Sequence, residues 1–219
     1  MLRREPGRRG LLSRLAAAIP NYLEIGWWGL ASPRLSERAP LVVYQGVVLR
    51  DGCVALAVRQ DLRGWELPGG NANLGESAEL ALVRELREEI GLNVIIERHV
   101  GDYIRTGFRP HTARVYACRV ISGRLRPSHE TPVVRWFDVE QVPTTLFPWY
   151  RVPLADALDP SGESRERHEH HGLRSIWAGL TIDLRMRVSE DTAGLPSPAD
   201  PGPQPQRKRP QPQEKGPSA

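Results

Sequence analysis

The sequence predicts an α/β protein in which helices pack on both faces of a mixed β-sheet. Runs of β-branched and aromatic residues, broken by turn-forming residues, predict the strands. An amphipathic helical pattern follows the second run, and another helical pattern covers residues 150–158. The predicted strands cover residues 41–49, 53–59, 94–106, 114–121 and 133–137.

The first two runs, LVVYQGVVL and CVALAVR, are separated by Asp51-Gly52. Asp-Gly between alternating apolar residues is typical of a tight hairpin turn. The next segment, WELPGG, predicts a short strand that ends at Gly69 and Gly70. Glycine allows positive φ and close approach of the backbone to a ligand, so this end of the strand is a candidate binding loop. Further along the chain, Gly101 and Ser122-Gly123 mark breaks between strands.

A helix follows the glycine loop. Leu82, Leu86 and Ile90 recur at i, i+4 and i+8, which gives a narrow apolar stripe for packing against a core. Ser77 is placed as an N-cap, and Gly91 follows the last apolar residue as a C-terminal stop. The order of strand, glycine loop and capped helix is therefore coherent.

The stretch RELREE, residues 84–89, brings three glutamates together on this helix. Glu85, Glu88 and Glu89 fall within an arc of about 100° along the edge of the apolar stripe. Like charges at these spacings destabilise an isolated helix by about 0.2–0.5 kcal/mol per pair. Arg84 and Arg87 compensate in part, and a divalent cation would compensate fully. A solvated surface helix is the alternative interpretation of the six residues alone.

The wider pattern from Gly70 to Leu92 resembles the signature of the Nudix hydrolases and departs from it at no fixed position. The resemblance implies an α/β/α sandwich with a mixed sheet over residues 40–160. It also implies hydrolysis of a nucleoside diphosphate linked to a moiety X, which gives NMP and phosphorylated X. The matching residues are Gly70, Glu76, Arg84, Glu85, Leu86, Glu88, Glu89, Gly91 and Leu92.

The resemblance further implies a metal site. It assigns the carboxylates of Glu85, Glu88 and Glu89, with the backbone carbonyl of Gly69, as ligands of Mg²⁺ or Mn²⁺. Hard divalent cations prefer such oxygen ligands and bind diphosphates through carboxylates and phosphate oxygens. They also neutralise phosphate charge and lower the pKa of water.

Catalytic roles follow from the same resemblance. Glu88 or Glu89 is a candidate base for the attacking water, and Glu130, in RPSHETPVVRWF, is a further ligand or base from a later loop. Arg84 is expected to orient Glu85, and Glu76 to brace the loop against the helix. A solvated loop glutamate remains the alternative for Glu130.

The sequence leaves the substrate open. It contains no secondary motif that selects one nucleotide class, and a Nudix-fold nucleotide-sensing or regulatory module with little turnover is the alternative function. Aromatic candidates for base stacking and arginine candidates for phosphate contact could equally be core or surface residues. They are Trp65, Tyr103, Phe108 and Trp149, and Arg59, Arg63, Arg105, Arg109 and Arg114.

Charge and cysteine content bound the partners and the compartment. The net charge of +4 belongs to residues 1–39, so the neutral core predicts no nucleic-acid surface. The small-molecule nucleotide substrate is what the Nudix resemblance implies. Cys53 and Cys118 lie in apolar runs and indicate buried thiols in a reducing, cytoplasmic compartment.

The ends of the chain are predicted to be extensions of the catalytic domain. Residues 1–39 are basic and too polar to span a membrane; packing on the domain, homodimer contacts and a membrane surface all remain open for them. Residues 161–188 predict an extension that packs on the domain, as a helix or an extra strand. Within it, His168 and His171 at helical spacing suggest a soft metal site, against a solvated loop with His170. Residues 189–219 predict a proline-rich disordered tail.

Overall fold

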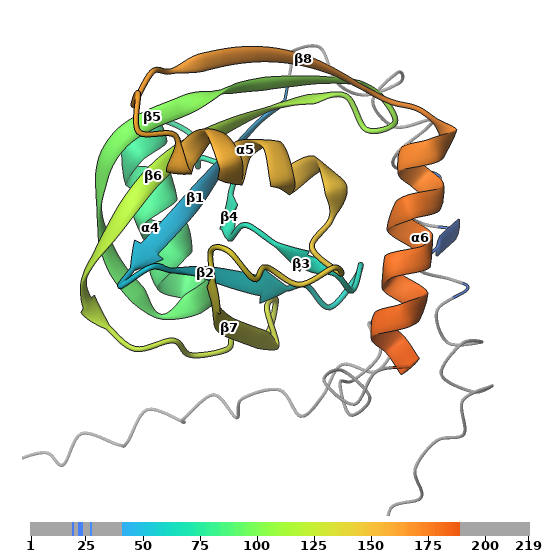
Figure 1. The fold of residues 1–219 in the computed structure, drawn as a ribbon, viewed down its shortest axis with the longest axis horizontal. Helices are drawn as coiled ribbons and strands as arrows, with labels where there is room; N and C mark the ends of the chain where they lie inside the picture. The colour runs from blue at the N-terminus through green and yellow to red at the C-terminus, as the bar shows by residue number, and fades with distance from the viewer. Residues whose placement is uncertain (1–18, 20–21, 24–26, 28–40, 189–219) are drawn as a thin grey trace, which may run out of the picture.

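The computed structural model describes residues 41–188 together with residues 19, 22, 23 and 27. Its centre is an 8-stranded mixed sheet with the order β3-β2-β1-β6-β5-β8, in which β4 pairs with β1 and β7 with β2. The helices are α4 (Ala78–Ile90), α5 (Pro148–Leu158) and α6 (Leu173–Val188), and α6 stands to the side of the sheet near β3 (Figure 1). The strands are β1 (Val42–Arg50), β2 (Cys53–Val58), β3 (Trp65–Glu66), β4 (Gly69–Gly70), β5 (Leu92–Gly107), β6 (His111–Gly123), β7 (Val133–Asp138) and β8 (Arg165–His171).

Neighbouring residues of β1 show that α4 and α5 lie on opposite faces of the sheet. A Cβ atom on Gly46 would meet the Leu86 side chain of α4 at 2.9 Å. The preceding residue, Gln45, instead reaches Tyr150 of α5 through a side-chain hydrogen bond of 3.2 Å. Because successive side chains of a strand point to opposite faces, the sheet lies between the two helices. The predicted α/β class, with helices on both faces of a mixed sheet, is confirmed.

The predicted hairpin is also confirmed. Strands β1 and β2 pair antiparallel with Arg50 opposite Cys53. Between them, Asp51 has a φ of 51° and Gly52 a φ of 74°. Positive φ at both central residues is the geometry of a type I′ turn, whose twist matches that of the flanking strands.

The helix that carries the glutamates begins and ends where the sequence predicts. The Ser77 side chain accepts a hydrogen bond from the Leu80 amide, and Gly91 adopts the left-handed conformation with a φ of 75°. Leu82, Leu86 and Ile90 are fully buried against the sheet. Burial of each such side chain stabilises the fold by about 1.5–3 kcal/mol, so this stripe fixes the orientation of α4.

The predicted strand over residues 94–106 forms, but Gly101, which the sequence marked as a break, does not interrupt it. Strand β5 continues through this residue with a register shift between His99 and Gly101. The parallel neighbour β8 comes so close that a Cβ atom on Gly101 would lie 2.2 Å from the Arg165 carbonyl oxygen. The glycine is therefore required for the approach of β8 and does not end the strand.

The C-terminal residues form both a strand and a helix. Strand β8 pairs parallel with β5, and Ile182 and Met186 of α6 join the core that also contains residues of α5. The histidines form neither the helical pair expected for a soft metal site nor a solvated loop, because His168 and His171 lie in β8. Residues three apart on a strand face opposite sides, and their side chains are 70% and 14% exposed, respectively.

Both cysteines are free thiols; Cys118 is buried, as the sequence predicts, whereas Cys53 is only half-buried. Burial raises the pKa of the Cys118 thiol to about 12. In the part of the chain that the structure describes, no helix is long and apolar enough to cross a membrane. The basic N-terminal extension, apart from residues 19, 22, 23 and 27, and the proline-rich tail lie outside the described residues.

Candidate active site

Glu89 is the most enclosed of the three predicted carboxylates on α4. Its side chain accepts a hydrogen bond of 2.9 Å from the Gly69 amide, and its backbone carbonyl accepts one of 2.5 Å from the Thr131 hydroxyl. Glu89 is 5% exposed. Burial, together with the negative charges of Glu85 and Glu130, raises the pKa of its carboxyl group to about 7. The site therefore contains a buried carboxylate that faces other acidic groups.

Two glycines bring the backbone of β4 against these carboxylates. Gly69 has a φ of 146°, and a Cβ atom there would lie 2.1 Å from the Tyr44 carbonyl oxygen of β1. A Cβ atom on Gly70 would lie 2.6–2.9 Å from the carboxylate of Glu85. Larger residues at these positions would displace the strand or the carboxylate, so the Gly-Gly pair sets the distance between β4 and α4.

Arg84 links the glycine loop to the helix. Its guanidinium donates to both carboxylate oxygens of Glu76, at 2.9 Å each, and to Glu85 at 2.8 Å. A longer contact of 3.3 Å reaches Glu88. Hydrogen bonds from Arg84 lower the pKa of Glu76 to about 2. These contacts fit the predicted orienting role of Arg84 and bracing role of Glu76, and they balance part of the charge of the glutamates.

Glu130 is placed beside the end of α4 by its backbone neighbours. The next residue, Thr131, is fully buried and donates its hydroxyl to the Glu89 carbonyl. The carbonyl of Glu130 accepts a hydrogen bond of 3.1 Å from the Gln60 amide. Glu130 itself is exposed, yet its charge contributes to the raised pKa of Glu89. The structure thus brings Glu130 into electrostatic range of α4, which the sequence alone did not establish.

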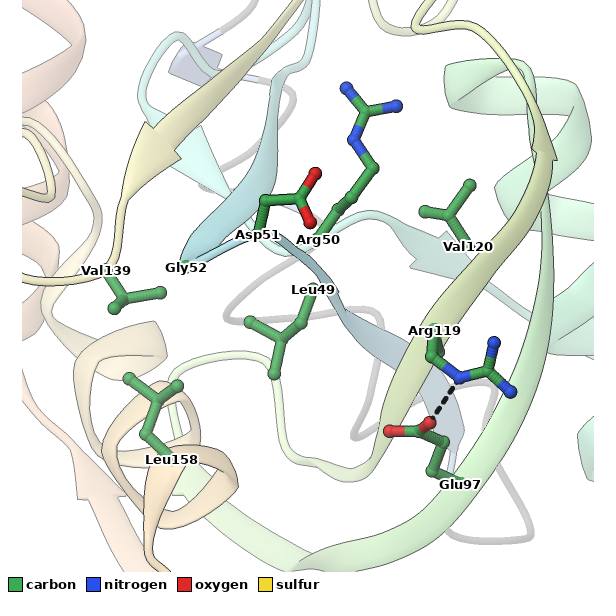
Figure 2. Close-up of a pocket in the computed structure, with 9 residues that line it drawn as sticks. All are labelled: Leu49, Arg50, Asp51, Gly52, Glu97, Arg119, Val120, Val139 and Leu158. Carbon is green, nitrogen blue, oxygen red and sulfur yellow. Dashed lines mark hydrogen bonds and ion pairs between the residues drawn. The ribbon is translucent and has the colours of Figure 1, made fainter.

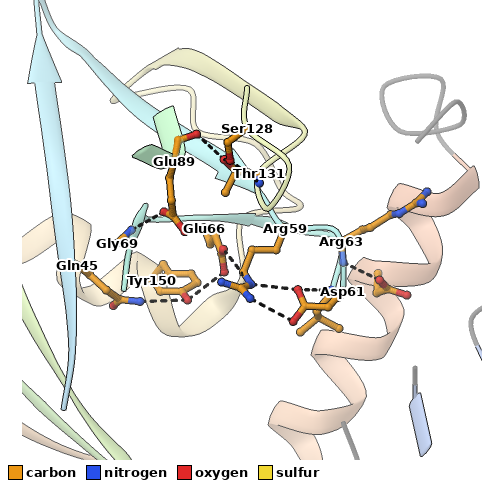
Figure 3. Close-up of polar contacts among 12 residues, drawn as sticks. Gln45, Arg59, Asp61, Arg63, Glu66, Gly69, Glu89, Ser128, Thr131 and Tyr150 are labelled. Atoms are coloured by element: carbon orange, nitrogen blue, oxygen red, sulfur yellow. Dashed lines mark hydrogen bonds and ion pairs between the residues drawn. The ribbon is translucent and has the colours of Figure 1, made fainter. Parts of the chain in front are cut away.

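Glu66 is an acidic residue of the site that the sequence reasoning missed. Burial raises the pKa of its carboxyl group to about 8, and the nearby charge of Glu89 contributes. The Tyr150 hydroxyl donates to Glu66 at 3.3 Å, and Gln45 donates to Tyr150 (Figure 3). Its position in WELPGG, three residues before Gly69, was the available signal. Its contacts with α5 could not be read from the sequence.

Of the arginine candidates for phosphate contact, Arg59 lies nearest to the carboxylates. Its Nε atom is 4.0 Å from Glu66, and its positive charge lowers the pKa of Glu89. Arg114 is instead engaged with Asp102, at 2.8 and 2.7 Å. Two further candidates are buried, with Arg63 4% and Arg105 2% exposed. The last, Arg109, lies at the turn after β5.

The aromatic candidates are mostly core residues. Trp65 is 2% exposed and packs edge-on against Phe137 at 4.7 Å, and Tyr103 is fully buried. Trp149 is half-buried and stacks on Phe147, also at 4.7 Å. Phe108 is half-buried beyond the end of β5. Base stacking by any of them stays a prediction.

The donor set suits a hard divalent cation. Glu85, Glu88 and Glu89 offer carboxylate oxygens along one side of α4, and the backbone of Gly69 meets Glu89 through its amide. Among the described residues, no three His, Cys, Asp or Glu side chains already converge as metal ligands, and Arg84 contacts both Glu85 and Glu88. A buried acid with a raised pKa beside further acids is nevertheless an arrangement that a cation would stabilise.

A separate hollow of about 430 Å³ lies at the other end of β1, at the turn of the β1–β2 hairpin (Figure 2). The described residues that line it include the exposed ion pair between Arg119 and Glu97, at 2.7 Å, but none of the predicted site residues. We therefore place the candidate active site at the glycine loop and not in this hollow.

Comparison with known proteins identifies the family. The family model described as NUDIX domain matches residues 40–157, more than half of the chain. The chain belongs to the Nudix family. The Nudix match ends within α5, so β8 and α6 lie beyond it.

Individual Nudix relatives agree with this assignment. A MutT-like protein of Streptomyces ambofaciens is 34% identical over 143 residues, which cover 64% of this chain and 92% of that protein. A CTP pyrophosphohydrolase of Escherichia coli is 35% identical over 125 residues, covering 53% and 89%. The crystal structure of a NUDIX hydrolase from Nitrosomonas europaea has a TM-score of 0.56 at 19% identity, over 62% of this chain and 81% of that one, and shows the shared fold.

Membership establishes the class of reaction. Nudix hydrolases cleave derivatives of nucleoside diphosphates and generally use divalent metal ions, and this chain is a Nudix-type diphosphohydrolase.

Proposed function

We propose that this chain hydrolyses the pyrophosphate bond of a nucleoside diphosphate linked to a further moiety, with Mg²⁺ or Mn²⁺, and gives NMP and phosphorylated X. The observation that carries the proposal is the buried carboxylate of Glu89. It lies under the Gly69 amide, within electrostatic range of Glu85 and Glu130. Its raised pKa reflects a buried charge among other acids, and a cation bound there would stabilise the carboxylate form.

The proposed roles divide between the α4 carboxylates and their neighbours. Glu85, Glu88, Glu89 and the Gly69 carbonyl would hold the cation, which supplies charge neutralisation and activates water toward phosphorus. Glu88 or Glu89 would accept the proton of the attacking water, and Glu130 is the alternative acceptor.

The remaining roles belong to arginines. Arg84 would keep Glu85 oriented through its contact of 2.8 Å. Arg59 would meet the phosphate oxygens, since a guanidinium binds them through paired hydrogen bonds. Its position beside Glu66 and its effect on Glu89 support this assignment.

The relative from Escherichia coli suggests where to begin the search for a substrate. It is named a CTP pyrophosphohydrolase, and CTP is a cytidine diphosphate linked to one further phosphate. The same reaction on a nucleotide sugar or a dinucleotide would give NMP and a phosphorylated sugar or a second nucleotide. These compounds therefore form one panel.

The test is turnover of this panel by the full chain. Nucleoside triphosphates, nucleotide sugars and dinucleotides are incubated with Mg²⁺ or Mn²⁺, and products are followed by phosphorus NMR, with EDTA as the control. We expect at least one compound to yield NMP in a metal-dependent reaction. If every compound survives, the alternative of a nucleotide-sensing or regulatory module replaces the enzyme.

A further inference from the structure

The C-terminal helix α6 contacts the loop that connects β2 to β3, residues 59–64, which we call the β2–β3 loop. Asp183 of α6 is fully buried and accepts a hydrogen bond of 2.6 Å from the backbone amide of Arg63. The same carboxylate accepts a second bond of 2.6 Å from Nε of Arg187 and a third from the Tyr22 hydroxyl. Asp183 is thus the common acceptor for α6, the loop and a residue near the N-terminus.

A second contact ties the loop to α6. Nη2 of Arg187 donates to the backbone carbonyl of Asp61 at 3.3 Å. The Asp61 carboxylate in turn accepts the Leu62 amide at 3.0 Å and Nε of Arg59 at 3.0 Å. The buried pair of Asp183 and Arg187 therefore binds the loop at Asp61 and at Arg63, through backbone groups that side-chain substitutions in the loop would not remove.

From the loop the contacts continue into the candidate active site. Besides its contact with Asp61, the Arg59 guanidinium lies near Glu66: the Nε atom of Arg59 is 4.0 Å from the Glu66 carboxylate (Figure 3). The amide of Gln60 donates to the carbonyl of Glu130 at 3.1 Å. One loop thus connects α6 to an arginine that acts electrostatically on Glu89 and to the segment that carries Glu130.

We propose that Asp183 is a positioning residue for pyrophosphate hydrolysis, because it anchors the β2–β3 loop and so fixes Arg59 beside the catalytic carboxylates. The inference rests on the proposed function. It also gives a role to residues outside the segment that the family model matches, since α6 begins after residue 157.

The need for anchoring follows from the nature of Arg59. Its side chain is 39% exposed, so packing alone does not fix the guanidinium. A misplacement of about 1 Å from a distant change can lower a rate by about 100-fold. Asp183 suits the task because a carboxylate only accepts, whereas its three partners all donate. An asparagine has the same size but would turn an amide donor toward one of these donors.

The test combines a double-mutant cycle with a measurement of the loop itself. The variants are Asp183→Asn, Arg59→Met and the double substitution. The matched control is Asp156→Asn, which replaces another buried aspartate. Asp156 ties β8 to the domain by accepting a hydrogen bond of 2.7 Å from Arg167. Steady-state kinetics on a cleaved member of the panel are compared with hydrogen exchange of the Gln60–Gly64 amides, and unfolding curves confirm that each variant is folded.

The proposal predicts a specific pattern. Asp183→Asn lowers kcat/KM by about 10- to 100-fold, with the same division between KM and kcat as Arg59→Met, and the double variant is no worse than Arg59→Met alone. Exchange of the Arg63 amide becomes faster. Asp156→Asn keeps kcat/KM within about twofold, because it is not in contact with the loop.

Other outcomes overturn the proposal. Additive losses in the double variant, or an equal loss in Asp156→Asn, would mean that Asp183 contributes only general stability. Unchanged exchange of the Arg63 amide would mean that Asp183 does not anchor the loop. If Asp183→Asn fails to fold, Arg187→Lys replaces it, since lysine keeps the ion pair but loses the contact with the Asp61 carbonyl. If the wild-type chain cleaves nothing, the proposed function fails, and the exchange measurement alone decides whether α6 anchors the loop.

Discussion

The carboxylates of α4 and the β2–β3 loop lie on two sides of the same candidate active site, but contacts of different sequence range hold them. On the α4 side, Arg84 reaches Glu76 across 8 residues and Glu89 reaches Gly69 across 20. On the loop side, Arg63 reaches Asp183 across 120 residues, and Glu66 reaches Tyr150 across 84.

The difference explains why a sequence signature of fixed spacing contains the α4 carboxylates but not the residues that hold the β2–β3 loop. A helix has a fixed pitch, so residues three and four apart meet whatever the rest of the chain does. The loop has no such internal order, and its geometry depends on α5 and α6. We therefore expect substitutions on the α4 side to act on chemistry first, and substitutions on the loop side to act on stability and positioning.

The largest expected effect belongs to the α4 side. Glu89→Gln keeps the size of the side chain and an acceptor for the Gly69 amide, but it removes the charge. We expect kcat to fall by about 10²- to 10⁴-fold with little change in the unfolding midpoint. Glu79→Gln on the exposed first turn of α4 is the control and should keep wild-type activity. A variant of Glu89 that retains kcat would remove this residue from the chemistry.

A smaller loss of activity is expected from Gly70→Ala. Its Cβ atom would lie 2.6–2.9 Å from the Glu85 carboxylate, and that flexible side-chain end can move aside. We expect kcat/KM to fall by about 10- to 100-fold while urea unfolding changes little. Gly172→Ala, where the nearest atom is 3.5 Å away, is the control. Equal activities of the two variants would show that the position of Glu85 is not critical.

On the loop side, Gly64→Ala should affect stability first. A Cβ atom there would lie 2.3–2.7 Å from ring atoms of Phe147, which is 1% exposed and stacked on Trp149. Such overpacking costs about 1–3 kcal/mol, so the urea midpoint should fall more than in Gly70→Ala. If Gly70→Ala were the less stable variant, the proposed division between the two sides would be wrong.

The same division explains how far the sequence predicted the molecule. The hairpin at Asp51-Gly52, the caps Ser77 and Gly91, and the buried stripe of α4 depend on local geometry, and each was predicted correctly. The matched family segment followed from a pattern of fixed spacing. The roles of the carboxylates remain predictions, although the structure brings Glu85, Glu89 and Glu130 within electrostatic range of one another.

What the sequence could not predict depends on distant contacts. Gly101 resembled a strand break, but β8 requires it for close approach to β5. The segment with the histidines of β8 was predicted as a helix or a loop, because its charged residues show no alternation of apolar and polar side chains that would indicate a strand. Glu66 and Asp183 look like ordinary surface acids until the fold buries them against Tyr150 and Arg187.

The effect expected to be smallest within a single pH unit concerns Glu66 on the loop side. Burial raises the pKa of Glu66 from 4.5 to about 8, so the folded state keeps a proton that the unfolded chain has released over this range. The contribution of Glu66 to stability is therefore fully present below about pH 4.5 and is lost as pH rises through about 8. Glu66→Gln cannot release a proton. With EDTA present, the free energy of unfolding of the wild type should fall relative to that of the variant by up to about 1.4 kcal/mol per pH unit. Urea unfolding at several pH values measures this difference, and a constant difference would show that Arg59 and Tyr150 stabilise the charged form enough to cancel the effect of burial.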